Sequence, residues 1–184
     1  PLFYDSSSPP KSGILLNNKQ LYSQFLIDLS NSHITTIKIQ LQNSFIIIVN
    51  AYFEPHLQID EHLVMMENIL QTFDQFPVII AGDLNARHYL WHDRICNTNG
   101  NLVAQLVDKY DLFVHNTNTN TYKGPTGTSS IDITITNGKA TRHLHSWKAT
   151  EHVHDIFDHK LITYSFFSIR PIPIRVPYRS RTFN

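Results

Sequence analysis

The sequence predicts an α/β protein in which two β-sheets pack face to face with helices outside, and three observations indicate this fold. The predicted elements run as several strands, a helix, a strand, a second helix and then strands again. Two helices are too few to cover every strand of one parallel sheet, which disfavours a doubly wound fold. The strand segments are rich in β-branched residues and mostly alternate, as strands of packed sheets do.

The N-terminal third predicts strands only. Residues 1–13 are rich in turn-forming residues and predict a loop or an edge segment. Short strands are expected over 13–18 and 21–29. Segments 33–41 and 44–52 then flank Gln42 and Asn43, which indicates a hairpin. Its second arm carries consecutive apolar residues, as a strand buried on both faces does.

Helical periodicity follows. From about Asp60 to Phe73 the apolar residues recur at helical spacing and predict an amphipathic helix. Residues 78–82 predict a buried strand, and 101–110 a second helix. Four strand-like segments complete the chain: 112–116, 129–137, 145–150 and 159–169.

Composition limits the class of protein. With 184 residues, 41% hydrophobic and 16% charged, the chain predicts one globular domain and not a disordered segment. Lys plus Arg and Asp plus Glu are equal at 15 each, so net charge indicates no polyanionic partner. The single Cys96 excludes an internal disulfide and favours a reducing, intracellular compartment. No apolar run approaches the roughly 20 residues that span a bilayer.

Three strand ends carry polar residues that packing does not explain. Asp83 and Asn85 follow one buried strand, Asp132 interrupts another, and Asp158 and His159 precede the last. A carboxylate in an apolar strand is costly unless a partner or a metal satisfies it. His159 is an available partner for Asp132, because a carboxylate commonly fixes an imidazole in one tautomer.

The same residues predict a hard-cation site. Asp83 and Asp158 could bind a divalent cation, with Asn85 offering a further oxygen, and such a sparse oxygen site suits Mg²⁺. A metal, a water-activating Asp and a His near the phosphoryl oxygens together would make a phosphodiesterase. The alternative interpretation is that each pair forms an ordinary turn, since Asp and Asn favour strand ends.

Histidines offer a competing interpretation. Three closely spaced pairs among the eleven histidines raise the alternative of a zinc-binding module: His88 and His92, His143 and His145, and His152 and His154. No HExxH signature is present, and we interpret most of these residues as solvated or interfacial. Trp91 is interpreted as a packing residue and not a platform for a base. Phosphate-loop, dinucleotide and serine-hydrolase motifs are absent.

Four segments, in their order and spacing, resemble the endonuclease/exonuclease/phosphatase superfamily. They are AYFEP, IIAGDLNARHYLWHD, SSIDITIT and FDHKLITYSF. Within that superfamily they are similar to the apurinic-type endonuclease domain of non-LTR retrotransposons. The resemblance implies a four-layer α/β/β/α sandwich of the DNase I-like type over residues 1–169. It also implies a basic linker toward a reverse transcriptase over residues 170–184.

The resemblance also implies roles for the site residues. Tyr52 would contact the scissile phosphate, and Asp132 would orient His159, which would stabilise that phosphate. Asp83 would orient or activate the attacking water with Asn85 beside it.

The metal site and the reaction are implied in the same way. Asp158, with Asp83 and Asn85, would form a site for Mg²⁺, or Mn²⁺ in its place. The implied activity is nicking of double-stranded DNA in the nucleus, which leaves a 3′-hydroxyl. The reverse transcriptase domain of the same polyprotein would extend that hydroxyl.

Two departures from the family pattern are apparent. The family opens with a strand, a helix and a strand ending in a Gln-Glu pair whose Glu is the principal metal ligand; this sequence begins after them. We therefore expect a fold lacking the first strand–helix–strand and expect this segment alone to nick poorly or not at all. Phe157 replaces the usual Ser before Asp158, and the loss of that hydroxyl is expected to loosen Asp158.

Other functions stay open at this point. Another phosphodiesterase of the superfamily, acting on phospholipids or inositol phosphates, would keep the same residue pairs. A non-catalytic relic that binds only DNA or a protein would also keep them.

Overall fold

The structure is a computed structural model that describes residues 1–18, 20–42, 44–125, 127–151 and 158–166. Phe157 and the predicted linker 170–184 lie outside these residues. The helices and single 3-10 turns are α1 (Asp60–Thr72), α2 (Thr98–Lys109), α3 (Gly138–Thr141), η1 (Ile27–Leu29) and η2 (Tyr89–Trp91). The strands are β1 (Leu2–Phe3), β2 (Ile14–Leu15), β3 (Ser23–Phe25), β4 (Ile34–Gln40), β5 (Phe45–Ala51), β6 (Val78–Asp83), β7 (Phe113–Val114), β8 (Tyr122–Gly124), β9 (Gly127–Ser129), β10 (Asp132–Thr136), β11 (Leu144–Thr150) and β12 (Leu161–Phe166).

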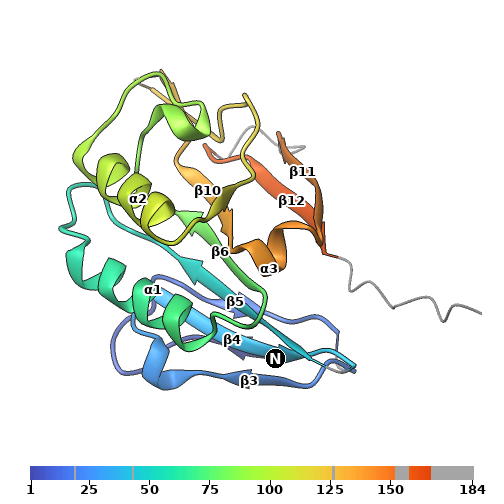
Figure 1. The fold of residues 1–184 in the computed structure, drawn as a ribbon. Coiled ribbons are helices and arrows are strands. Elements are labelled where there is room, and N and C mark those ends of the chain that lie inside the picture. The colour runs from blue at the N-terminus through green and yellow to red at the C-terminus, as the bar shows by residue number, and fades with distance from the viewer. Residues whose placement is uncertain (19, 43, 126, 152–157, 167–184) are drawn as a thin grey trace, which may run out of the picture.

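A six-stranded sheet in the order β3-β4-β5-β6-β10-β7 forms the centre of the molecule (Figure 1). The predicted hairpin is confirmed, because β4 and β5 pair antiparallel from Ile34 opposite Ala51 to Gln40 opposite Phe45. Strand β5 also pairs parallel with β6, so it is an inner strand. This position accounts for the uninterrupted apolar run that the sequence shows in β5.

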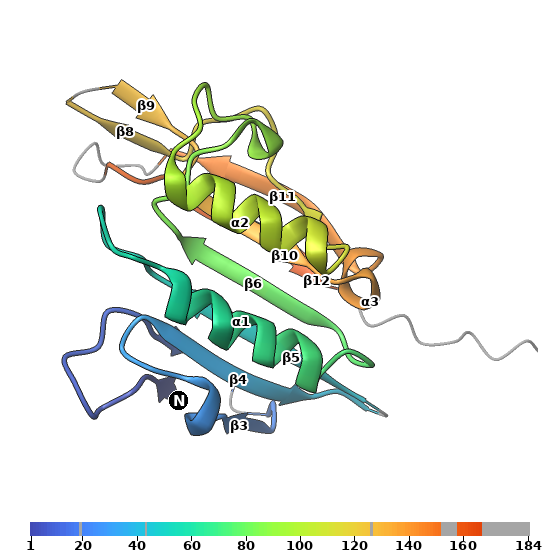
Figure 2. The same cartoon turned by 60° about the vertical axis from the view of Figure 1, so that its left-hand side comes forward.

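Helices α1 and α2 lie side by side on one face of this sheet (Figure 2). Helix α1 buries Met66, Ile69 and Leu70 there, and α2 buries Val103 and Leu106. Helix α1 matches its prediction closely, whereas α2 begins three residues earlier than predicted. Its first turn is polar, so apolar periodicity alone does not detect it.

The β11–β12 sheet packs on the opposite face of the six-stranded sheet (Figure 2). Successive residues of β5 point to alternate faces, so Ile47 contacts the helix layer while Ile46 packs with Trp147 of β11. Two sheets packed face to face are therefore confirmed, with α1 and α2 on the outer face of the larger sheet. In the described part of the chain, no helix is long and apolar enough to cross a membrane.

Two strand predictions need correction, and one hairpin was not predicted. The segment 21–29 forms a strand only over β3 and then turns as η1, where Ser30 bonds back to the Leu26 carbonyl and competes with strand pairing. The segment 129–137 is not one strand: β9 ends at Ser129, and Asp132 is the first residue of β10. The hairpin of β8 and β9 was not predicted, because its three-residue arms carry no apolar run.

Candidate active site

Asp83 is positioned by the close approach of β5 and β6. Gly82 precedes it with φ 144°, and a Cβ on Gly82 would lie 1.9 Å from the Ala51 carbonyl oxygen. Only glycine fits this position. The Asp83 carbonyl then accepts from the Phe53 N–H at 2.9 Å, and the side chain is 14% exposed. The C-terminal end of β6 is thus fixed, and it places the Asp83 carboxylate where the inner strands of the sheet end.

Asn85 is held in an orientation that leaves one oxygen available. Its backbone has φ 44°, a left-handed conformation that Asn tolerates better than most residues. Its N–H donates to Asp83 Oδ1 at 3.0 Å, and its Nδ2 donates to the Phe53 carbonyl at 2.7 Å. Because the amide nitrogen is used by the protein, Oδ1 is the atom that remains for a ligand.

His159 pairs with Asp132 as the sequence indicated. Asp132 stands directly opposite Asp83 in the β6–β10 register, and His159 lies just before β12. His159 Nδ1 is 3.0 and 2.9 Å from the two Asp132 oxygens. A carboxylate only accepts, so Nδ1 carries the donated proton. His159 Nε2 then faces Asp83 Oδ2 at 3.7 Å.

Charge and burial shift both groups toward their protonated forms. Burial raises the pKa of Asp83 to about 6. The N–H of Asn85 opposes this rise, and the negative charge of Asp132 adds to it. The hydrogen bond to Asp132 raises the pKa of His159 and outweighs the opposing effect of burial. The site therefore combines a carboxylate whose pKa is raised to about 6 with a histidine whose pKa is raised by its carboxylate partner.

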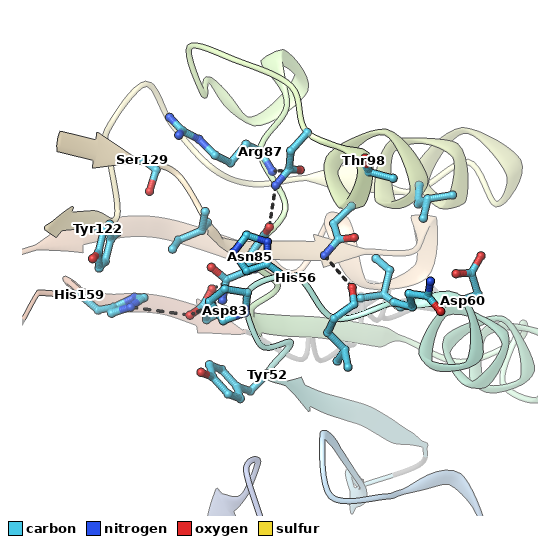
Figure 3. Close-up of a pocket in the computed structure, with 18 of the residues that line it drawn as sticks. Tyr52, His56, Asp60, Asp83, Asn85, Arg87, Thr98, Tyr122, Ser129 and His159 are labelled. Atoms are coloured by element: carbon cyan, nitrogen blue, oxygen red, sulfur yellow. Dashed lines mark hydrogen bonds and ion pairs between the residues drawn. The ribbon is translucent and has the colours of Figure 1, made fainter. Parts of the chain in front are cut away.

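A cavity of about 900 Å³ opens beside these residues (Figure 3). Tyr52, Asp83, Asn85, Asp158 and His159 all line it. The structure therefore brings five of the six predicted site residues to one cavity, and the sixth, the histidine's partner, to hydrogen-bond contact with it. Their individual roles stay predictions.

The donor set fits a hard cation. Asp83, Asp132 and His159 each offer one possible metal-ligand atom, and these three atoms lie within 4.8 Å of one another. Both Asp132 oxygens already bond to the imidazole, so the oxygens of Asp83 and Asn85 are the better ligands, and Mg²⁺ prefers such oxygens. Asp158 lines the cavity but is outside that three-residue group.

Zinc has less support. The group of Asp83, Asp132 and His159 is the only metal-competent group within the described ranges, and none of the predicted histidine pairs belongs to it. His88 is used differently, since its Nδ1 accepts from the Leu90 N–H and caps η2. His152 and His154 lie outside the described residues. Trp91 is fully buried, so its predicted packing role is confirmed.

The sequence did not indicate two features of this cavity. Arg87 lines it and forms an ion pair with the buried Asp93. Asn97 and Thr98, at the start of α2, line the same wall. Arg87 and Asp93 are six positions apart in a turn-rich loop, a pattern that solvated residues show equally well.

The fold matches solved structures of the DNase I-like type. The endonuclease domain of TRAS1, a telomere-specific non-LTR retrotransposon, matches with a TM-score of 0.84 and 18% identity, over 92% of this chain and 81% of that chain. The AP endonuclease LMAP from Leishmania major matches with a TM-score of 0.62 and 10% identity, over 82% of this chain and 63% of that chain. The predicted DNase I-like class is confirmed.

Sequence comparison places the chain within this class. The signature of the endonuclease-reverse transcriptase family matches residues 46–163, and the chain belongs to this family. A retrovirus-related Pol polyprotein, from the type-1 retrotransposable element R1 of Bradysia coprophila, is 24% identical over 161 residues. The match covers 82% of this chain and 16% of that polyprotein. The similarity to endonuclease domains of non-LTR retrotransposons that the motifs indicated is therefore confirmed.

Proposed function

We propose that this domain nicks double-stranded DNA with the help of Mg²⁺, or of Mn²⁺ in its place. The nick leaves a 3′-hydroxyl that a reverse transcriptase of the same polyprotein extends in the nucleus. The observation that carries the proposal is the contact of His159 with Asp132 at 2.9 Å beside Asp83, on the wall of an open cavity.

Each residue has a chemical task in this proposal. Asp83 accepts the proton of the attacking water, as a carboxylate placed within hydrogen-bond reach of that water can. The His159 cation, held by Asp132, donates from Nε2 to a phosphate oxygen where negative charge grows in the transition state. The phosphorus–O3′ bond breaks, and the departing oxygen takes up a proton to become the 3′-hydroxyl.

The metal complements these side chains. Asp83, Asn85 and Asp158 would hold the metal ion, which when bound would stabilise negative charge on a phosphate oxygen. The Tyr52 hydroxyl, on the same wall, would orient the phosphate. Because most protein–DNA contacts go to the backbone, this machinery does not by itself select a target sequence.

Nicking of supercoiled plasmid tests the proposal. With protein in excess over plasmid and Mg²⁺ present, we expect open circles to form, even if turnover is slow. Asp83→Ala and His159→Ala should each slow the reaction at least about 100-fold, the usual scale of acid–base catalysis. EDTA should stop the reaction, and polymerase extension from the nick should confirm the 3′-hydroxyl.

A matched control separates loss of the site from loss of one carboxylate. Asp74→Ala removes an exposed Asp beyond the far end of α1, and its nicking rate should equal that of wild type. Nicking that survives both site substitutions contradicts the assigned residues. The absence of wild-type nicking at every metal concentration contradicts the proposed activity of this chain.

A further inference from the structure

Arg87 is the single Lys or Arg among the described residues that line the cavity. The other charged side chains that the structure describes on the cavity wall are acidic or are histidines, and the acidic ones are Asp60, Asp83 and Asp158. A DNA strand that enters the cavity brings one negative charge with each phosphate. Among the described residues of this wall, Arg87 is therefore the one permanent cation that can meet it.

The Arg87 guanidinium is fixed before any ligand binds. Its Nε donates to Asp93 Oδ1 at 3.0 Å, and its Nη2 lies 2.9 Å from the same oxygen. Asp93 is held in turn by the Ser130 N–H at 2.8 Å. Burial alone would raise the pKa of Asp93, but the bonds from Arg87 and Ser130 lower it, so the ion pair persists at neutral pH.

The backbone of Arg87 is equally constrained. Its N–H donates to Asn97 Oδ1 at 2.9 Å, and its carbonyl accepts from the Asn97 N–H at 3.0 Å. Gly100, in the first turn of α2, packs so closely that a Cβ would lie 1.8 Å from the Arg87 carbonyl oxygen. Because both the backbone and the guanidinium of Arg87 are already held, the residue loses little conformational entropy when it meets a ligand.

Part of the guanidinium remains available. The Arg87 side chain is 29% exposed, against 1% for Asp93. Figure 3 shows it extending toward Ser129, on the side of the cavity where Tyr122 and His159 also lie. Asp93 engages only one edge of the fork, and the remaining N–H groups have no acceptor among the residues that the structure describes.

We propose that Arg87 binds a DNA backbone phosphate next to the scissile one, and that Asp93 is the residue that positions it. This inference rests on the proposed function, because it takes DNA as the ligand. Guanidinium groups suit phosphate oxygens through paired N–H donors, and such contacts set the register of the strand without reading its sequence.

The salt dependence of DNA binding tests this contact without requiring cleavage. Affinity for short duplexes of two unrelated sequences is measured in metal-free buffer over a range of salt concentrations. The key variant is the double substitution Arg87→Gln with Asp93→Asn, because Arg87→Gln alone leaves a buried carboxylate unpaired. Arg87→Lys, which keeps the charge, is the conservative variant, and thermal unfolding checks that each variant folds.

The double variant should bind both duplexes about tenfold more weakly, the scale of one charge-assisted hydrogen bond. Its slope of log affinity against log salt should fall by about 0.9, the value for one lost phosphate contact. Arg87→Lys should restore most of the slope. Arg142→Gln is the matched control: it lies just after α3, at the far end of the sheet, and should change neither quantity.

The outcomes separate this inference from the proposed function. A folded double variant with an unchanged slope overturns the Arg87 contact, even if nicking still depends on His159. A reduced slope in a chain that does not nick supports the contact and contradicts the proposed activity. Wild-type protein that binds neither duplex overturns both.

Discussion

Asp83 is the residue whose ionisation conflicts most with its surroundings. Burial raises its pKa to about 6 from an ordinary value of 3.8, so its charged form is held at neutral pH at a cost in folding free energy. A metal or a proton from water would relieve this cost. Residues that serve catalysis commonly make the folded protein less stable than a neutral replacement would.

The first prediction concerns Asp83→Asn, measured in EDTA. Between about pH 4 and pH 6 the folded state keeps a proton that the unfolded chain has lost, so wild-type stability falls as pH rises through this window. The variant lacks this fall. Urea unfolding near pH 7.5 should show the variant more stable by about 1–3 kcal/mol, at 1.36 kcal/mol per pKa unit. Near pH 4 the difference should vanish, and equal stability at both pH values contradicts the pKa assignment.

Individual contacts differ in how far the sequence reveals them. The contact between Asp132 and His159 was predictable, because a carboxylate beside apolar β-branched residues requires a partner. The ion pair of Arg87 and Asp93 was not, since the Asp93 environment is completed by the Ser130 N–H, 37 positions away. Only the folded chain shows that this carboxylate is buried.

At the scale of elements, one asparagine side chain joins the loop that follows β6 to α2. Asn97 Oδ1 accepts from the N–H groups of Arg87 and Gly100, at 2.9 and 2.7 Å. Its Nδ2 donates to the Asn85 carbonyl at 3.0 Å. The Asn97 side chain thus links the loop that begins at Asn85 to the first turn of α2. We therefore expect the positions of Asn85 and Arg87 to depend on this helix cap.

The second prediction follows from this closure. Asn97→Ala should lower the free energy of unfolding by about 1–2 kcal/mol, the upper range for a helix cap, and should also slow nicking. Asn97→Asp is the matched control, because it keeps both accepted bonds and loses only the donor to Asn85. Urea unfolding and single-turnover nicking compare the two. A stability loss in Asn97→Asp as large as in Asn97→Ala contradicts the capping role.

The predictability of each element depended on its apolar pattern. Helix α1 was predicted within one residue, because apolar residues recur along it at helical spacing, and Met66, Ile69 and Leu70 are buried. The predicted start of α2 was too late, since the first turn of this helix is recognised by its cap and not by apolar periodicity. Strands β8 and β9 were not predicted, because their short arms carry no apolar pattern. Tyr122 of β8 nevertheless contacts His159, with ring centroids 4.9 Å apart.

At the scale of the whole molecule, the site is shared between the two sheets. Asp83 and Asp132 belong to the six-stranded sheet, whereas His159 leads into β12 of the second sheet. The patterning of the sequence predicted that two sheets would pack. It could not predict which side chain fixes their spacing, and in the structure Trp147 Nε1 donates to Thr134 Oγ1 at 3.0 Å between the layers.

The last prediction is that Trp147→Phe weakens the site from a distance. The substitution removes the inter-sheet hydrogen bond and part of a buried side chain, and should lower the free energy of unfolding by about 1–2 kcal/mol. Because His159 reaches Asp132 only when the sheets are packed, nicking should slow and amide exchange in β11 and β12 should accelerate. Ile69→Val, in α1 on the helix side, is the control: it should cost about 1 kcal/mol and leave nicking unchanged. Equal nicking by both variants would show that the spacing of the sheets does not govern the site.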